Sequence, residues 1–212
     1  IYDQLGNGLV LRSYEDRHLG FNNSIEGLSA TFSIADWLSV KGLTGRPRLY
    51  SDYASSWVRA ANLTFSLDQL LGWDAVLLSL EGNYVNRHEE LDSNPAYDFA
   101  SRGLTSPDLN MYSAALNFGW DALSLKAEYA MKGDDLASPS QMKAHKGAAI
   151  YAEAIYDYKS FSASATFRIL DHMGTMLSLV SSASGDGGTG NSLKYLPSLT
   201  RHYSYMLANL NP

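Results

Sequence analysis

The chain has 212 residues, of which 45% are hydrophobic and 18% charged, so it suits one or two folded domains and is not a disordered chain. Its net charge of −6 offers no basic face, and nucleic acid is therefore not expected as a partner. The absence of cysteine excludes disulfides, thiolate metal sites and thiol nucleophiles. No run approaches the roughly 18 apolar residues that a membrane-spanning helix needs.

Apolar and polar residues alternate with a period of two over most of the chain, which is typical of β-strands that bury one face. Residues 27–34 show this clearly, because Leu28, Ala30, Phe32 and Ile34 are apolar while the residues between them are small or polar. The same alternation predicts further strands over residues 9–16, 38–45, 61–67, 76–84, 112–120, 123–131, 148–156, 161–168 and 203–210. The sequence thus predicts an all-β fold of about ten strands and no helix. We expect a single domain over residues 1–212, incomplete at one or both ends.

The connections between these strands alternate between short and long. Short ones are expected at residues 35–36, 68–74, 121–122 and 157–160, and long ones at 17–25, 46–56, 86–109, 132–147 and 169–202. Bacterial outer-membrane barrels join their strands in this way, with short turns at the periplasmic end and long loops outside. The pattern predicts an antiparallel up-and-down transmembrane β-barrel in the cell outer membrane, with lipid as its first partner.

Aromatic and charged residues agree with this assignment. Trp37, Trp73 and Trp120 all lie at short turns, where we expect them to anchor the barrel at one membrane interface. Charged residues within the strands are expected to face the lumen, where they stay hydrated. The predicted lumen-lining residues are Arg12, Lys41, Arg59, Glu81, Lys126, Glu128, Glu153 and Arg168. A water-soluble barrel or sandwich is the alternative, since it also alternates polar and apolar faces.

Several short motifs, given with their first and last residues, connect the chain to a known group. They are GNG at 6–8, LRSYEDR at 11–17, LG at 19–20, NS at 23–24, WL at 37–38, KGL at 41–43, GR at 45–46 and YLP at 195–197. With these motifs the chain resembles an uncharacterised family of large outer-membrane β-barrel proteins from the Bacteroidota. Members of that family are considerably longer than 212 residues, so the resemblance implies a fragment, a part of a larger barrel or an unusually short relative.

Other chemistry has little support in the sequence. His88, Glu89, Glu90 and Asp92 could hold a surface cation, but such a cluster in a polar loop is usually only hydrated. The glycine-rich run at residues 185–190 has the spacing of a dinucleotide motif without the strand and helix that the motif requires. His172 or His202 near the serines at 181–184 could form a hydrolase dyad, yet no strained nucleophile turn is present. We therefore expect no catalytic residue, no metal, no cofactor and no enzyme activity.

Two functions remain. The first is a passive, porin-like pore whose selectivity depends on the lumen charges, with residues 169–202 long enough to fold inward and constrict it. The second is a structural or accessory subunit of a larger outer-membrane complex for secretion or insertion, with other outer-membrane proteins as partners and a closed lumen.

Overall fold

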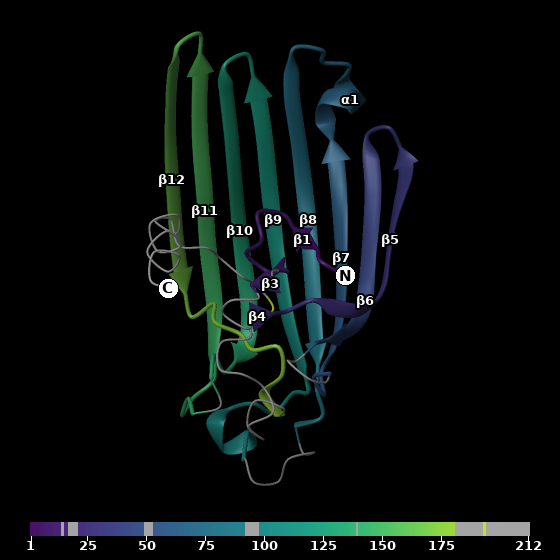
Figure 1. The fold of residues 1–212 in the computed structure, drawn as a ribbon, viewed down its shortest axis with the longest axis vertical. Helices are drawn as coiled ribbons and strands as arrows, with labels where there is room; N and C mark the ends of the chain where they lie inside the picture. Colours follow the sequence, from purple (N-terminus) through teal and green to yellow (C-terminus); the bar gives the residue numbers. More distant parts are fainter. Residues whose placement is uncertain are drawn as a thin grey trace, which may run out of the picture.

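The computed structural model describes residues 1–13, 15–16, 21–48, 53–91, 98–138, 140–180 and 193. Its main feature is one long antiparallel sheet of eight strands in the order of the chain (Figure 1). The strands are β5 (Ile25–Ala35), β6 (Leu38–Pro47), β7 (Trp57–Ser66), β8 (Val76–His88), β9 (Asp108–Trp120), β10 (Leu123–Asp135), β11 (His145–Tyr158) and β12 (Phe161–Asp171). The prediction of an all-β, antiparallel up-and-down fold is confirmed.

Other predicted elements differ. Residues 9–16 form no strand of this sheet: β1 (Gln4–Leu5) pairs with β2 (Leu11–Arg12), and β3 (Glu15–Asp16) pairs with β4 (Phe21–Asn22) in two separate ribbons. The apolar residues Leu9, Val10 and Leu11 follow one another without alternating and are all buried, which explains why the strand prediction was wrong here. The predicted strand at 203–210 lies outside the described residues.

The expectation of no helix is wrong at one connection. Between β7 and β8 the chain forms a single helical turn, α1 (Leu67–Leu71), which ends at Gly72 in the left-handed conformation. A 3₁₀ turn, η2 (Ala100–Arg102), lies in the long connection between β8 and β9. No helix within the described residues is long and apolar enough to cross a membrane.

Short and long connections lie at opposite ends of the sheet (Figure 1). The turns β5–β6, β9–β10 and β11–β12 and the α1 connection are at one end, here called the turn end. The long connections are at the other, the loop end. Within the described residues β5 and β12 each pair on one side only, so the sheet is open rather than a closed barrel.

The register of the sheet is strongly staggered. Following paired residues from Ala35, the last residue of β5, across all eight strands leads to Phe167 of β12. Phe167 lies six residues from Phe161, where β12 leaves its turn. Six residues correspond to about 20 Å along the strand, and seven strand spacings correspond to about 34 Å across the sheet. The line that joins the turns is therefore oblique to the strands, which are tilted by roughly 30° from the perpendicular to this line. Strands of β-barrels are tilted by about 35–45°.

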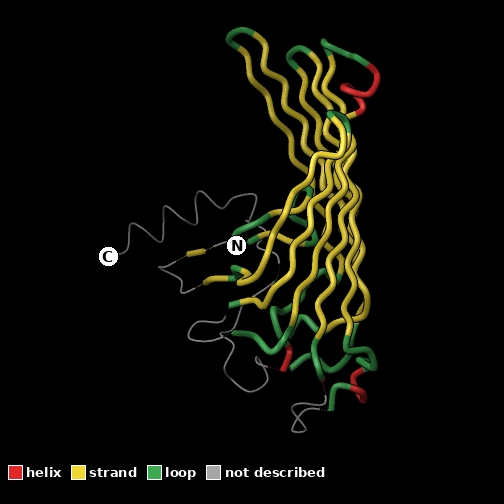
Figure 2. The backbone as a smooth tube through the Cα atoms, turned by 90° about the vertical axis from the view of Figure 1, so that its right-hand side faces the viewer, coloured by secondary structure: helices red, strands yellow, loops and turns green. Residues whose placement is uncertain are grey.

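The rest of the described chain covers only one face of the sheet, and Figure 2 shows the start of the chain and the loop-end segments on this side. We call it the inner face and the opposite one the outer face. Residues 1–13, the inner segment, and residues 172–180, the inner strap, lie on the inner face near the loop end. The outer face therefore stays uncovered by the described chain.

The outer face carries the apolar residues of the alternation. The register aligns them in rows across the sheet, because successive side chains of a strand point to opposite faces. Leu28 is 69% exposed and Phe32 and Ile34 are 65% exposed. Further exposed members of this face are Leu63, Leu80, Tyr112, Trp120, Tyr129, Met131, Ile150, Tyr156, Phe161, Phe167 and Ile169. From the turn end to the level of Gly82 and Ala114, the aligned rows contain no charged residue, and the next row, that of Tyr84 and Tyr112, ends at Asp171 of β12.

Candidate functional site: the inner face of the sheet

The half of the inner face nearer the turn end is lined by hydroxyl, amide and charged side chains. Asn62 of β7 is at its centre and donates to Asn83 Oδ1 at 2.7 Å and to Glu81 Oε2 at 3.3 Å. Asn117 of β9 reaches the other oxygen of Glu81 at 3.1 Å, and Asn83 donates to Ser113 Oγ at 3.0 Å. These bonds join three neighbouring strands in a hydrogen-bonded ladder, which fixes the polar side chains in place.

Charges of both signs continue this surface toward β12. Lys126 Nζ of β10 lies 3.6 Å from Glu153 Oε1 of β11. The other carboxylate oxygen of Glu153 accepts a hydrogen bond from the Tyr151 hydroxyl at 2.7 Å. Arg168 of β12 is directly paired with Tyr151 and points to the same face. The inner face thus presents a mixed, partly neutralised set of charges rather than a strongly acidic or basic one.

Most of the predicted lumen-lining residues share this face. Register and alternation place six of the eight on it, namely Lys41, Glu81, Lys126, Glu128, Glu153 and Arg168. Arg12 belongs to β2, outside the sheet. Arg59 is paired with Thr44 and Asn86 and shares the parity of Ala61 and Leu63, so it lies on the outer face. The alternation along β7 already indicates this position in the sequence, because Arg59 is separated by even numbers of residues from the apolar Ala61 and Leu63.

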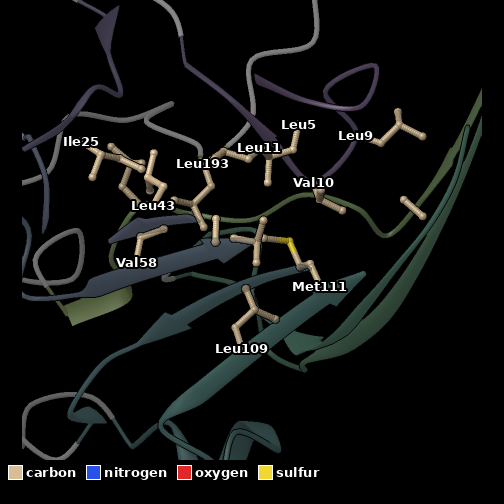
Figure 3. Close-up of a cluster of buried hydrophobic side chains, with 14 of the residues drawn as sticks. Leu5, Leu9, Val10, Leu11, Ile25, Leu43, Val58, Leu109, Met111 and Leu193 are labelled. Carbon is tan, nitrogen blue, oxygen red and sulfur yellow. The ribbon is translucent and has the colours of Figure 1, made fainter. Parts of the chain in front are cut away.

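The inner segment covers the other half of the inner face. Leu5, Leu9, Val10 and Leu11 form one buried apolar cluster with side chains of the sheet (Figure 3). The sheet contributes Leu43, Val58, Ala60, Val85, Leu109, Met111, Ala130 and Ala149. Complete burial of a leucine contributes about 1.5–3 kcal/mol, so this packing substantially stabilises the segment in its position on the inner face.

Two polar contacts accompany that packing. Asp3 of the inner segment forms an ion pair with Lys41 of β6. The backbone N–H of Asn7 donates to Glu128 Oε2 at 2.6 Å, and Glu128 is almost fully buried in β10. The inner segment therefore engages two charged residues of the inner face that stand four strands apart.

A buried ion pair fastens the inner strap. Arg87 of β8 donates to Asp135 Oδ1 of β10 at 2.8 Å, and its other nitrogen donates to the carbonyl of Met176 at 2.6 Å. Thr175 donates its hydroxyl proton to Asp135 Oδ2 at 2.6 Å, while Lys132 Nζ donates to the carbonyl of Gly174 at 3.0 Å. All three charged side chains are buried, and they are bound by one another and by the strap rather than by solvent, although Arg87 Nε has no hydrogen-bond partner among the described residues.

Glu89 is a second anchor of the strap, and the sequence analysis missed it. It is 1% exposed and accepts hydrogen bonds from Ser178 Oγ, from Leu179 N at 2.8 Å and from Val180 N at 3.0 Å. Ser55 Oγ also donates to it, at 2.8 Å. The view of His88, Glu89 and Glu90 as a hydrated loop is thus wrong for Glu89, and Asp92 lies outside the described residues. No local pattern marks Glu89, because its partners lie about 90 residues away.

Polar side chains form a separate network on the outer face at the loop end, beyond the apolar rows. Asn86 donates to Asp108 Oδ1 at 3.1 Å, and His88 Nδ1 lies 3.0 Å from the same oxygen. Arg59 Nη1 reaches Asn86 Oδ1 at 3.5 Å. The hydrogen bond from Asn86 is the main cause that holds the pKa of Asp108 below its usual value, and the hydrogen bond and charge of His88 act in the same direction. The apolar outer face therefore ends at a hydrogen-bonded polar border.

The predicted interface tryptophans all lie at the turn end. Trp37 stacks on Phe65, with ring centroids 6.4 Å apart, and Trp120 is 56% exposed at the end of β9. Trp73 follows α1, and its backbone N–H donates to the carbonyl of Asp68 at 2.9 Å. Trp73 and Trp120 also line a pocket of about 580 Å³ together with Asp68, Asp74, Asp121 and Asp157.

The histidines and acidic residues in the part of the chain that the structure describes do not gather into a metal site. His145 and His172 stack with ring centroids 4.5 Å apart, but no group of three or more His, Asp or Glu side chains there could hold a metal ion. The serines at 181–184, His202 and the glycine-rich run at 185–190 lie outside the described residues. The hypothetical hydrolase dyad therefore includes residues outside the described part of the chain.

Fold and site define an all-β protein with a meandering antiparallel sheet, an uncovered apolar outer face and a polar inner face that its own chain partly covers. The chain belongs to DUF6029, a family of unknown function, which it matches over residues 1–212. No curated protein and no solved structure matches it.

Proposed function

We propose that this chain forms the wall of a β-barrel in the outer membrane of a Gram-negative bacterium. The observation that carries the proposal is the inversion of the two faces nearer the turn end: there the exposed outer face is apolar and the inner face is mainly polar. A water-soluble antiparallel sheet buries its apolar face and hydrates the other one. Lipid acyl chains are the partner that suits an apolar outer face of this extent, and the Bacteroidota resemblance agrees with this location.

The height of the apolar region supports the same proposal. On the outer face of β8 it runs from Val76 to Tyr84, and on β9 from Trp120 to Tyr112, which is nine residues, or eight residue steps, in each strand. Eight residue steps span about 27 Å along a strand, and a tilt of roughly 30° reduces this to about 23 Å. Outer-membrane barrels carry an apolar band about 25 Å high between two aromatic girdles. Trp37, Trp73 and Trp120 would form one girdle and Tyr84 and Tyr112 the other.

A closed barrel also requires partners for the strands at the two edges. In a bilayer each unpaired backbone group costs several kcal/mol, so β5 and β12 must pair with each other or with further strands. The stagger of the register gives the strands the tilt that closure needs. The barrel proposal therefore includes edge pairing beyond that of the open sheet described above.

Within this barrel we propose a passive, porin-like pore as the function. The mixed charges Lys126, Glu153 and Arg168 would line a hydrated lumen and set a weak ion selectivity. The second candidate is a structural or accessory subunit of an outer-membrane complex. It is favoured by one specific observation, namely that the inner segment and the inner strap cover the loop end of the inner face.

Membrane location is tested by electrophoresis of the detergent-purified full-length protein with and without boiling. A folded barrel migrates differently until it is boiled, whereas a protein that is monodisperse without detergent would refute the membrane proposal.

Pore function is tested in planar bilayers by charge reversal. Lys126→Glu and Arg168→Glu should shift the reversal potential toward cation selectivity. Arg59→Glu is the matched control, because it makes the same charge change on the outer face and should leave selectivity unchanged. Absence of conductance from folded protein, with the inner segment seated or displaced, would favour the accessory subunit instead.

A further inference from the structure

We propose that the inner segment, residues 1–13, is a plug that closes the lumen at the loop end and opens the pore when it leaves its seat. This inference rests on the proposed pore function. It assigns a regulatory role to a segment that forms no strand of the eight-stranded sheet. The contacts of the segment, its backbone conformation and its support by the strap all point to a fitted seat.

The apolar side chains of the segment fit against the one apolar region of the inner face. Leu9, Val10 and Leu11 are 0–1% exposed, and Figure 3 shows Val10 and Leu11 close to Met111 of the sheet. Nearer the turn end the same face is polar, as the Asn62 and Glu81 ladder shows. The inner face is thus mainly polar near the turn end, although Leu77 is exposed there, and it carries a continuous apolar cluster where the segment lies. This apolar part of the wall is the seat that the segment occupies.

The polar contacts spread the segment across the width of the sheet. Asp3 is bound to Lys41 on β6 and Asn7 to Glu128 on β10, so the chain between them crosses over β7, β8 and β9. Both sheet residues belong to the set predicted to line the lumen. When the segment is seated, Asp3 neutralises the positive charge of Lys41, the backbone of Asn7 donates a hydrogen bond to Glu128, and the segment occupies the space in front of both residues.

Gly6 lies directly against side chains of the sheet. Its φ is +55°, and a Cβ at this position would lie 2.9 Å from both Asn83 Nδ2 and Glu128 Oε1. A side chain at this position must therefore displace either the polar ladder or the segment itself. Gly72, after α1, has a similar φ of +66° but open space around it. A substitution strains the backbone at both positions, because both glycines have a positive φ. Only a substitution at Gly6 also causes a steric clash.

The inner strap supports the plug from the loop side. Met173 and Leu177 of the strap belong to the same apolar cluster, and the backbone N–H of Arg12 donates to the carbonyl of Leu193 at 3.2 Å. The strap itself is fastened by the buried charges of Arg87, Asp135 and Glu89. Besides its apolar contacts, the inner segment is held by the Asp3–Lys41 ion pair, by the hydrogen bond to Glu128 and by hydrogen bonds between Ile1 and the backbone of Ile25. Of the two segments, it is the one that can be displaced without exposing a buried cluster of charges.

The test compares single-channel recordings of the full-length wild type, Gly6→Val and Gly72→Val, all shown to be folded by their heat-dependent migration. Overpacking of a fitted seat typically shifts the ratio of seated to displaced states by about tenfold or more. We expect Gly6→Val to increase the open probability by that factor, with wild type and Gly72→Val mostly closed. Equal open probability in all three would overturn the plug while leaving the pore proposal intact.

A second pair of variants guards against misfolding of Gly6→Val. Glu128→Gln with Lys41→Gln removes both charged contacts of the segment without adding volume, and it should open the pore as well. In the opposite direction, Asp3→Cys with Lys41→Cys, joined by a short thiol-specific cross-linker, should hold the pore closed; the chain has no cysteine to interfere. Full conductance after cross-linking would overturn the plug. Silence of every folded variant would overturn the pore proposal, and the plug with it.

Discussion

Arg87 and Asp135 form a buried ion pair that bridges β8 and β10 over the strand between them. Arg87 Nη2 lies 2.8 Å from Asp135 Oδ1, and both side chains are less than 5% exposed. Each also binds the inner strap, Arg87 through the Met176 carbonyl and Asp135 through the Thr175 hydroxyl. The pair is therefore both a link within the sheet and the attachment point of a segment that lies 40 or more residues further along the chain.

Removing one member of this pair should destabilise the protein strongly. Arg87→Met leaves Asp135 as an uncompensated buried charge, which typically costs about 3–5 kcal/mol. The measurement is the free energy of unfolding in urea, in micelles or bilayers. Arg48→Met, at an exposed position, is the control and should change it by less than about 0.5 kcal/mol. The double change of Arg87→Met with Asp135→Leu should recover much of the loss; no recovery would mean that the ion pair is not the cause.

Glu89 should control the order of the inner strap. Glu89→Ala leaves two buried backbone donors at Leu179 and Val180 without an acceptor, at a cost of about 1–3 kcal/mol for each. Amide hydrogen exchange of residues 172–180 should accelerate in this variant. Glu90→Ala, at the exposed neighbouring position, should leave the exchange unchanged. Equal protection in both variants would contradict the role assigned to Glu89.

The two faces of β8 should respond oppositely to a charge. Leu80 lies on the outer face near the middle of the apolar region, whereas its neighbour Ser79 lies on the inner face beside Asn117. A lysine on the lipid face near the midplane costs about 2–4 kcal/mol, so Leu80→Lys should lower the free energy of unfolding in bilayers by that amount. Ser79→Lys should have little effect. If both variants unfolded alike, the outer face would not be in contact with lipid.

The outer polar network should make stability depend on pH through Asp108. The pKa of this carboxyl is lowered in the folded state, chiefly by Asn86 and His88 and also by the charge of Arg59. A lowered pKa contributes stability that is fully present above the unfolded value, about 3.9, and is lost as the pH falls through the folded value. The difference in unfolding midpoint between wild type and Asp108→Asn should therefore be constant near neutral pH and shrink below about pH 4. A difference that grows on acidification would contradict this assignment.

Much of the fold could be predicted from the sequence because β-strands repeat every two residues. The alternation of Leu28, Phe32 and Ile34 with small polar residues identified β5, and the same reasoning identified the other seven strands of the sheet. It failed for residues 9–16, where Leu9, Val10 and Leu11 are buried together and carry no alternation. It also failed at α1, a single turn that is too short to show helical periodicity.

Part of the candidate site could also be predicted, but only where it follows strand parity. Lys126, Glu153 and Arg168 share the inner face because each has the polar parity of its strand. Arg59 was grouped with them for its charge, although its parity is that of Leu63. It lies beyond the apolar rows, where the outer face becomes polar and a charge is no longer costly.

The sequence by itself determined the strands, the alternation of short and long connections and the identity of the two faces, since all of these depend on neighbouring residues. Only the tertiary structure decided what covers the inner face. The contact of Asn7 with Glu128 joins residues 121 positions apart, and Glu89 meets Val180 across 91 positions. Such contacts depend on how the strands are staggered and on which segments fold back over them. No local pattern records that arrangement, because it arises from packing between distant parts of the chain.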